Sequence, residues 1–356
     1  DTTSMQTNTI YALEASGSDL WIGTNIAGYI WDGFSVSETT IGPRSDWTKR
    51  PSQHFDYVLD GNAMWSGTNI GVCKYDLSGN IADCLNVYDG MPNWATYAVD
   101  VNSTTVFGGT FSGVGLIEKS SFSVVDVWDA GEQTDNAVVE IIDDIAYIGL
   151  NGVGVARWDI SNSQWLTTWT TSNVLDNGNQ FVTSMIEDIR PGFIWIGGED
   201  GFQLINTTTG AEAYDIETSN SLYVGNGDPY DLTLYGYTMY YHQGASSDSI
   251  YGIDVGNFTA ITPLDAGQEV NENGGDVVSM TIVGDTLLAS VVSGQWWNAD
   301  GSGGIAQYDL TSNSWNSSIL PEGAVDRVTA FNSSTGHTWI SWGEIGLEVY
   351  SPSGTK

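Results

Sequence analysis

The sequence predicts an all-β protein, a β-propeller of eight blades with four antiparallel strands each, with seven blades as the alternative. Three observations lead to this fold class. A short motif centred on an aromatic residue recurs eight times along the 356 residues. Runs of strand length with alternating apolar and polar residues flank each copy, and turns rich in Ser, Asn, Gly and Thr separate them. No segment shows the apolar period of a helix.

The recurring motif is clearest in LWIGT and MWSGT, whose glycines are Gly23 and Gly67. The same reference position recurs at intervals of 40 to 51 residues, at Gly23, Gly67, Gly109, Gly149, Gly197, His242, Ser290 and Ser341. Two positions earlier the chain carries Trp21, Trp65, Phe107, Tyr147, Trp195, Tyr240, Leu288 and Trp339. We expect the large side chain to pack one twisted blade against the next, and the glycine to lie where inner strands crowd together.

The predicted blades form a single domain over residues 1–356. They cover residues 9–43, 54–89, 94–129, 136–170, 181–217, 228–263, 276–319 and 326–351. In each blade an alternating run precedes the motif, a second run follows it, and a fourth lies beyond a polar turn. The last unit has only three such runs, so residues 1–7 are expected to supply its fourth strand and close the ring. Donation of residues 1–7 to a neighbouring subunit is the alternative. The chain has seven blades if the divergent unit around His242 is an insertion.

The charge balance is strongly acidic, with 9 Lys and Arg against 44 Asp and Glu and a net charge of −35. Such a surface repels phosphate backbones and anionic lipids, so we expect no nucleic-acid partner. No run of 18 apolar residues is present, and we expect no membrane insertion. Multivalent cations or a saline medium would suit this charge.

The two cysteines, Cys73 and Cys84, are equidistant from a Ser-Gly-Asn turn. The turn predicts a hairpin in which the two residues face each other, and we expect a disulfide, with two free thiols as the alternative. A simple two-residue turn would place them at a hydrogen-bonded pair, which is awkward for a bridge, so we also expect a β-bulge. A disulfide is typical of an oxidising compartment.

Sequons for N-glycosylation favour an extracellular or cell-surface location, with the periplasm as the alternative. They occur at Asn102, Asn206, Asn257, Asn316 and Asn332. The opening DTTSMQTNTI has neither the basic start nor the apolar stretch of a signal peptide, and its Asp1 suggests a processed segment.

Several segments resemble the repeats of the periplasmic sensor propellers of two-component regulators. The resemblance rests on DGMPNWATYAVDVNSTTVFGGTFSGVGLIE (residues 89–118), SDLWIGTNIAGYIWD and FVTSMIEDIRPGFIWIGGEDGFQLIN, which follow that family's order of a Pro-Asn lead-in, an Asp and an LWIGT-like strand. It extends over nearly the whole chain but concerns packing residues. The resemblance implies a propeller used for extracellular binding or surface display. The chain contains no kinase or membrane span, so the sensor role is not carried over.

The motifs of common enzyme classes are missing. His54, His242 and His337 are isolated, which argues against a zinc site. The DGSGG at 300–304 has the wrong order for a serine protease and reads as a hairpin loop. No phosphate-binding Gly-Lys-Ser/Thr motif or Rossmann fingerprint is present.

The loops that lead into the first strands are the best candidate site, because in a propeller they surround one mouth of the channel. They carry His54, Asn93, Asp135, Asp326 and Arg327. Carboxylates gathered there would suit calcium, and Asp228, Asp231 and Asp276, in or beside two oxygen-rich loops, are the candidate ligands. The alternative is that these residues make turns or solvate a wet channel. Paired carboxylates for glycoside hydrolysis are also compatible with this mouth.

One loop concentrates basic residues, with Arg44, Trp47, Lys49 and Arg50 in GPRSDWTKRPSQH. It could dock on the acidic surface of a second copy and build rings or filaments. Local ion pairs with Asp46 or Asp56 are the alternative.

These observations favour a non-enzymatic extracellular or cell-surface propeller that serves adhesion, assembly or ligand binding. Its expected partners are a glycan, a protein or further copies of itself, and calcium is the only expected cofactor. A carbohydrate-active hydrolase or lyase with its site at the channel mouth is one alternative. A ligand-binding sensor domain of a larger receptor is the other.

Overall fold

The computed structural model describes residues 10–39, 51, 53–129, 137–150, 152–176, 181–199, 201–217, 228–243, 247–270, 275–292, 303–316, 330–332, 338–342 and 346–350. For residues 137, 283 and 330 onward the description is of the backbone alone. The chain divides into two compact units, Thr3–Met185 and Ile186–Lys356. We call these the N-terminal unit and the C-terminal unit.

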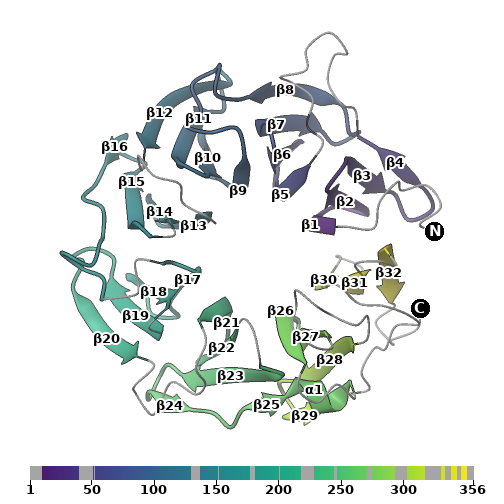
Figure 1. Cartoon of the computed structure of the whole chain (residues 1–356), viewed down its shortest axis with the longest axis vertical. Helices are drawn as coiled ribbons and strands as arrows, with labels where there is room; N and C mark the ends of the chain where they lie inside the picture. Colours follow the sequence, from purple (N-terminus) through teal and green to yellow (C-terminus); the bar gives the residue numbers. More distant parts are fainter. Residues whose placement is uncertain are drawn as a thin grey trace. The chain divides into compact units, whose positions relative to one another are not determined.

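The N-terminal unit holds four antiparallel sheets, each built from four strands that follow one another in the chain (Figure 1). The first sheet is β1 (Ile10–Ser16), β2 (Asp19–Thr24), β3 (Gly28–Trp31) and β4 (Val36–Glu38). The second is β5 (His54–Asp60), β6 (Ala63–Thr68), β7 (Gly71–Asp76) and β8 (Ile81–Leu85). The third is β9 (Thr96–Val101), β10 (Thr105–Thr110), β11 (Gly113–Glu118) and β12 (Ser123–Asp129). The fourth is β13 (Ala137–Ile142), β14 (Ile145–Leu150), β15 (Gly154–Asp159) and β16 (Gln164–Trp165). The first strands β1, β5, β9 and β13 contact one another in turn.

The C-terminal unit repeats this plan, and its first strand crosses the boundary between the units. The fifth sheet is β17 (Ser184–Glu187), β18 (Phe193–Gly198), β19 (Gly201–Asn206) and β20 (Glu212–Glu217). The sixth is β21 (Pro229–Tyr235), β22 (Thr238–Gln243), β23 (Ser249–Asp254) and β24 (Thr259–Ala260), to which β25 (Leu264–Asp265) adds a fifth strand. The seventh is β26 (Asp276–Val283), β27 (Thr286–Val292), β28 (Gly303–Asp309) and β29 (Ser314–Trp315). The last is β30 (Ala330–Asn332), β31 (Thr338–Trp342) and β32 (Gly346–Tyr350).

The fold is an all-β propeller, but the prediction of eight four-stranded blades is wrong. The described residues form seven blades of four consecutive antiparallel strands, to the sixth of which β25 is added, and the sheet β30–β32 has three. Each copy of the aromatic motif marks the second strand of a sheet. The strand β31 carries an eighth copy, although its sheet has only three strands and is not a complete blade. The predicted completion of this sheet by residues 1–7 lies outside the described residues.

The aromatic motif occupies the second strand of each sheet. Its large side chains on β2, β6, β10, β14, β18, β22 and β27 are all 6% exposed or less. Trp21 on β2 meets two rings of the next sheet edge-on, Tyr57 on β5 at 5.7 Å and Tyr75 on β7 at 5.8 Å between ring centroids. This contact confirms, for the first two sheets, that the motif packs adjacent blades.

The glycine of the motif is required by a close backbone approach. A Cβ atom on Gly23 would lie 2.7 Å from the carbonyl oxygen of His54, and one on Gly67 would lie 2.7 Å from that of Thr96. His54 and Thr96 each begin the first strand of the following sheet. Any larger residue would therefore push neighbouring blades apart.

Part of the acidic excess serves to cap turns. Asp76, at the end of β7, accepts hydrogen bonds from the backbone N–H groups of Ser78 and Asn80, both at 2.9 Å. Asp309, at the end of β28, does the same for Ser312 and Thr311, and these bonds lower its pKa to about 2. Equivalent turns follow Asp32, Asp159, Asn206 and Asp254. These side chains act as acceptors for otherwise unpaired turn amides.

The described residues contain a single helix, α1 (Ala266–Glu269), of four residues. No helix in the described ranges has the length and apolar character needed to cross a bilayer.

Candidate functional site

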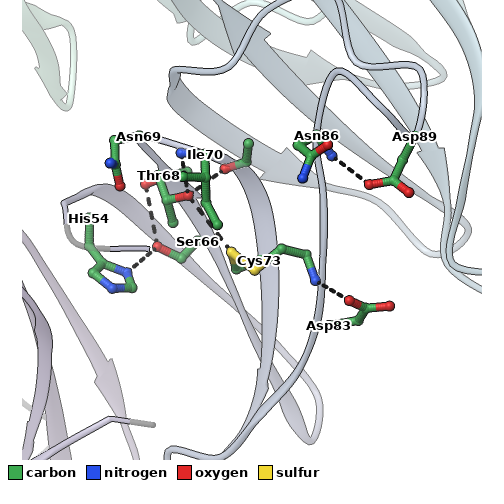
Figure 2. The surroundings of a disulfide bond; sticks show 12 residues. His54, Ser66, Thr68, Asn69, Ile70, Cys73, Asp83, Asn86 and Asp89 are labelled. Atoms are coloured by element: carbon green, nitrogen blue, oxygen red, sulfur yellow. Dashed lines mark hydrogen bonds between the residues drawn. A yellow bond between two sulfur atoms is a disulfide. The ribbon is translucent and has the colours of Figure 1, made fainter. Parts of the chain in front are cut away.

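The structure confirms the predicted disulfide between Cys73 and Cys84 (Figure 2). The two residues face each other on β7 and β8 with their Cα atoms 4.1 Å apart, the short separation of a pair without ladder hydrogen bonds. The predicted bulge is also present, because the register shifts between Lys74 and Tyr75. Both sulfurs belong to fully buried residues, in a core that includes Trp21 and Tyr57.

The three candidate calcium ligands lie on two sheets of the C-terminal unit. Asp228 precedes β21, Asp231 lies on it, and Asp276 begins β26. Asp276 is 1% exposed, whereas the Asp231 side chain is 44% exposed. Across the described ranges, no three His, Cys, Asp or Glu side chains are grouped closely enough to hold a metal ion. Calcium binding therefore stays a prediction from the sequence alone.

Asp231 instead joins two neighbouring first strands. It lies at a register shift of β21 with a φ of 49°, and its Oδ2 accepts the backbone N–H of Met280 on β26 at 3.1 Å. His242 Nε2 lies 3.3 Å from the same oxygen. Asp56 on β5 makes the corresponding bond to Val99 N–H on β9, at 2.8 Å. A carboxylate at a bulge thus links adjacent blades in both units.

Of the five residues predicted at the channel mouth, two are described. His54 is completely buried, with Nδ1 3.0 Å from the Ser66 hydroxyl (Figure 2). Asn93 lies in the β8–β9 loop and donates from Nδ2 to the Ser112 hydroxyl at 2.8 Å. Asp135, Asp326 and Arg327 lie outside the described residues. The predicted contact loop of Arg44, Trp47, Lys49 and Arg50 also lies outside them.

The sequons differ in how accessible their amide nitrogens are. Asn257 and Asn316 are exposed, and Asn206 is half-buried. The Nδ2 atom of Asn102 is buried, while its Oδ1 accepts N–H bonds from Thr104 and Thr105 at 2.8 Å. Asn332 has only its backbone described.

We expect Asn102 to carry no glycan when the chain is secreted from a glycosylating host. The glycan would have to attach at a nitrogen that the fold buries, whereas Asn257 and Asn316 are open to it. Peptide mapping by mass spectrometry, with and without enzymatic removal of N-glycans, measures occupancy at each sequon. A glycopeptide containing Asn102 in the folded fraction would contradict this assignment.

A row of aromatic side chains, which the sequence analysis did not identify, runs across the first strands of the N-terminal unit. Tyr11 on β1 lies 5.6 Å from Phe55 on β5, and Phe55 lies 5.0 Å from Tyr97 on β9, between ring centroids. Phe111, in the β10–β11 turn, lies 6.3 Å from Tyr97. All four side chains are partly exposed. We refer to these four residues as the aromatic row.

The same backbone irregularity produces three members of the row. The register shifts between Ile10 and Ala12 on β1 and between His54 and Asp56 on β5, and the same occurs at the start of β9. In each case the second residue of the strand is left unpaired, and it is Tyr11, Phe55 or Tyr97 respectively. A β-bulge turns such a side chain out of the ladder, and bulges are frequent beside binding sites. In the sequence, the feature that indicates this row is an aromatic residue at the second position of three first strands.

Two further exposed rings lie on the β8–β9 loop. Tyr88 is 76% exposed and Trp94 is 37% exposed, and their rings meet edge-on at 5.2 Å. The Asn93–Ser112 hydrogen bond ties the loop that carries them to the turn that carries Phe111. Exposed aromatic side chains are therefore also present on the loop that is hydrogen-bonded to the turn of Phe111.

Three of the carboxyl groups on the strands of the row have raised pKa values. Burial raises the pKa of Asp56 to about 7, against the opposing effect of the Val99 and Tyr57 N–H groups, and the charges of Glu14 and Asp100 raise it further. Burial also raises the pKa of Glu14 and of Asp100. Desolvated carboxyls of this kind are frequent at functional sites and also occur in structural networks. The hydrogen bond that Asp56 accepts from Val99 N–H gives this carboxyl group a structural role.

The described cations are on third strands or in turns. Lys74 and Arg157, on third strands, cover the Trp65 and Trp169 rings at 4.9 and 4.3 Å. Lys119, just after β11, pairs with Asp60 at 2.6 Å, and Arg190 in the β17–β18 turn pairs with Asp188 at 2.6 Å. Among the described residues, none of these positive charges is on a first strand. The row is aromatic and acidic, without a described basic group to hold an anionic ligand.

Comparison with known proteins supports the fold alone. No protein-family model matches the chain, and no curated protein matches its sequence. The Dos1 propeller is similar in structure, with a TM-score of 0.72, 12% identity and coverage of 99% of this chain and 94% of that one. The extracellular domain of the hybrid two-component system BT3049 from B. thetaiotaomicron has a TM-score of 0.55 and 12% identity, covering 98% of this chain and 52% of that one. BamB from Moraxella catarrhalis has a TM-score of 0.53 and 14% identity, covering 79% and 80%. At these identities the similarity establishes a β-propeller and no activity.

Proposed function

We propose that this protein is a non-enzymatic, extracytoplasmic binding propeller that holds an extended neutral polysaccharide on the aromatic row. The observation that carries the proposal is the repeated bulge that presents Tyr11, Phe55 and Tyr97 on three adjacent strands. Packing alone does not require a half-exposed ring at each of these positions. A continuous line of rings suits the apolar faces of successive sugars.

Charge selects among polysaccharides. The net charge of −35 and the carboxyl groups of Glu14 and Asp100 on the same strands oppose binding of uronic-acid or sulfated chains. A neutral polysaccharide is not repelled by these charges, and stacking of its sugars on the aromatic row stabilises the complex.

The buried disulfide supports the extracytoplasmic location, because disulfides persist in oxidising compartments. Similarity to an extracellular domain of a two-component system agrees with this location. That similarity also supports a second candidate, a sensor domain of a larger receptor, in which the same row would bind the signal.

Affinity gel electrophoresis with mixed-linkage β-glucan, mannan and xylan, compared with alginate and polygalacturonate, tests the proposal. We expect retardation by at least one neutral chain and none by the two anionic chains. Each of Phe55→Ala and Tyr97→Ala should weaken binding on the order of tenfold, the effect of losing about 1 kcal/mol or slightly more of stacking. Phe34→Ala, at a side chain 97% exposed in the β3–β4 turn, is the matched control and should bind normally.

Two results would overturn the proposal. Binding that survives both row substitutions would place the ligand elsewhere. Release of reducing sugars from the bound chain, lost in Asp56→Asn, would instead support a glycoside hydrolase.

A further inference from the structure

A group of buried polar side chains lies between the first and second sheets of the N-terminal unit. It consists of Trp21 on β2, His54 and Tyr57 on β5, and Tyr75 on β7, which we call the buried polar cluster. None of the four is more than 5% exposed. The His54 ring lies 5.5 Å from that of Tyr57 and 5.8 Å from that of Tyr75, between centroids. Trp21 contacts both tyrosines.

Each member of the cluster has one polar atom without a hydrogen-bond partner. These atoms are Trp21 Nε1, His54 Nε2, Tyr57 Oη and Tyr75 Oη. The Ser66 and Thr39 hydroxyls lie near the two phenols but outside hydrogen-bonding geometry. Buried polar groups are nearly always paired, so four unpaired atoms within one set of contacting rings call for a common partner.

The backbone at Gly28 shows that some of these atoms converge. A Cβ atom on Gly28 would lie 2.5 Å from Tyr57 Oη, 2.7 Å from Thr39 Oγ1 and 3.3 Å from His54 Nε2. Three polar atoms, two from β5 and one from the residue that follows β4, therefore surround one point. A side chain at residue 28 would displace them.

The hydrogen bonds of His54 define the kind of ligand that this site can bind. The Ser66 hydroxyl donates to the carbonyl oxygen of Asp56 at 3.0 Å, so it accepts from His54 Nδ1–H. The Nε2 atom is then a bare acceptor, and burial, which lowers the pKa of His54 to about 3, keeps the ring neutral. The Trp21 indole is a donor, and the phenols can donate or accept. The matching ligand is small, neutral, and both donor and acceptor.

We propose that the buried polar cluster is an internal hydration site, in which bound water donates to His54 Nε2 and pairs with the tyrosine hydroxyls and the Trp21 indole. Water is the smallest molecule with this chemistry, and a buried water commonly joins two to four polar groups. Such water would form part of the joint between the first two blades.

A crystal structure of the full chain at a resolution that defines ordered water tests this directly. We expect water within 2.7–3.2 Å of His54 Nε2, bonded also to at least one of Tyr57 Oη and Tyr75 Oη. A direct Tyr57–His54 hydrogen bond with no water would overturn the proposal. Density for a larger molecule would overturn the assignment to water.

Stability provides a second, independent readout. If the site is hydrated, Tyr57→Phe and Tyr75→Phe should each lower the folding equilibrium constant on the order of tenfold, because a satisfied hydroxyl is removed. If the hydroxyls are unpaired, the same substitutions leave the constant unchanged or raise it, which would contradict the proposal. Tyr88→Phe, at an exposed ring, is the matched control and should have no effect.

Discussion

Replacing Trp65 by alanine is expected to lower the free energy of unfolding by about 3–5 kcal/mol, the usual loss for a large buried aromatic. Trp65 is fully buried on β6 and packs with Phe122 at 5.7 Å. Its Nε1 donates to Asp60 at 3.1 Å, and the Lys74 ammonium lies over its ring. Alanine would leave a cavity in the core that also contains Val72 of the same sheet and Val99 of the next one.

Chemical denaturation followed by circular dichroism measures this effect. Trp65→Phe keeps a ring in the core, so it should lower the free energy of unfolding by clearly less than Trp65→Ala does. Trp94→Ala, at a tryptophan 37% exposed, is the control and should stay within about 1 kcal/mol of the unmodified protein. If Trp65→Ala were no more harmful than Trp94→Ala, the repeated aromatic would not be a blade-packing residue.

The second large effect concerns the pH dependence of stability, which His54 and Asp56 are expected to control in opposite directions. Burial lowers the pKa of His54 from 6.5 to about 3, so its contribution to stability is lost as pH falls below 6.5. Burial raises the pKa of Asp56 from 3.8 to about 7, so its contribution is present at low pH and lost as pH rises toward 7. Between about pH 4 and 6.5 the two contributions cancel.

Single substitutions should therefore reveal opposite slopes. Relative to the unmodified protein, Asp56→Asn leaves only the His54 contribution, and the free energy of unfolding should rise by about 1.4 kcal/mol per pH unit across that range. His54→Asn leaves only the Asp56 contribution, and the free energy should fall by a similar amount per unit. A loss of packing shifts the whole curve of a variant without changing its slope.

Urea unfolding at half-unit steps from pH 4 to 6.5 measures these slopes. Glu14 and Asp100 act on Asp56 electrostatically, but they are common to all the proteins compared. The double variant is the control, since removing both groups should restore the original slope. If the curve of Asp56→Asn ran parallel to that of the unmodified protein, Asp56 would be ionised in the folded state, and a parallel curve for His54→Asn would show that folding does not shift the pKa of His54.

The sequence was sufficient to predict features set by local pattern. The aromatic motif identified the second strand of each sheet, because its side chains are large, periodic and buried. The turn between Cys73 and Cys84 predicted both their pairing and the bulge beside it, since hairpin register follows from residues near in sequence. The number of complete blades was overestimated, because the motif does not report a fourth strand.

Features set by contacts between blades could not be predicted. His54 was assigned to a channel mouth as a polar residue in an entry loop, but it begins β5 and is covered by Tyr57 and Tyr75. The raised pKa of Asp56 depends on burial and on Val99 of the next sheet. The aromatic row depends on three bulges, and a shift of one residue in strand register leaves no clear mark in the sequence.

The most direct test of the proposed function uses the neutral polysaccharide that slows the protein in affinity gel electrophoresis. Isothermal titration calorimetry measures its binding to the unmodified protein and to the Phe55→Ala/Tyr97→Ala double variant. Phe34→Ala is the control, and circular dichroism confirms that each variant is folded. We predict that the double variant loses binding by on the order of a hundredfold while Phe34→Ala retains it. Equal affinities for all three proteins would show that the aromatic row is not the binding site.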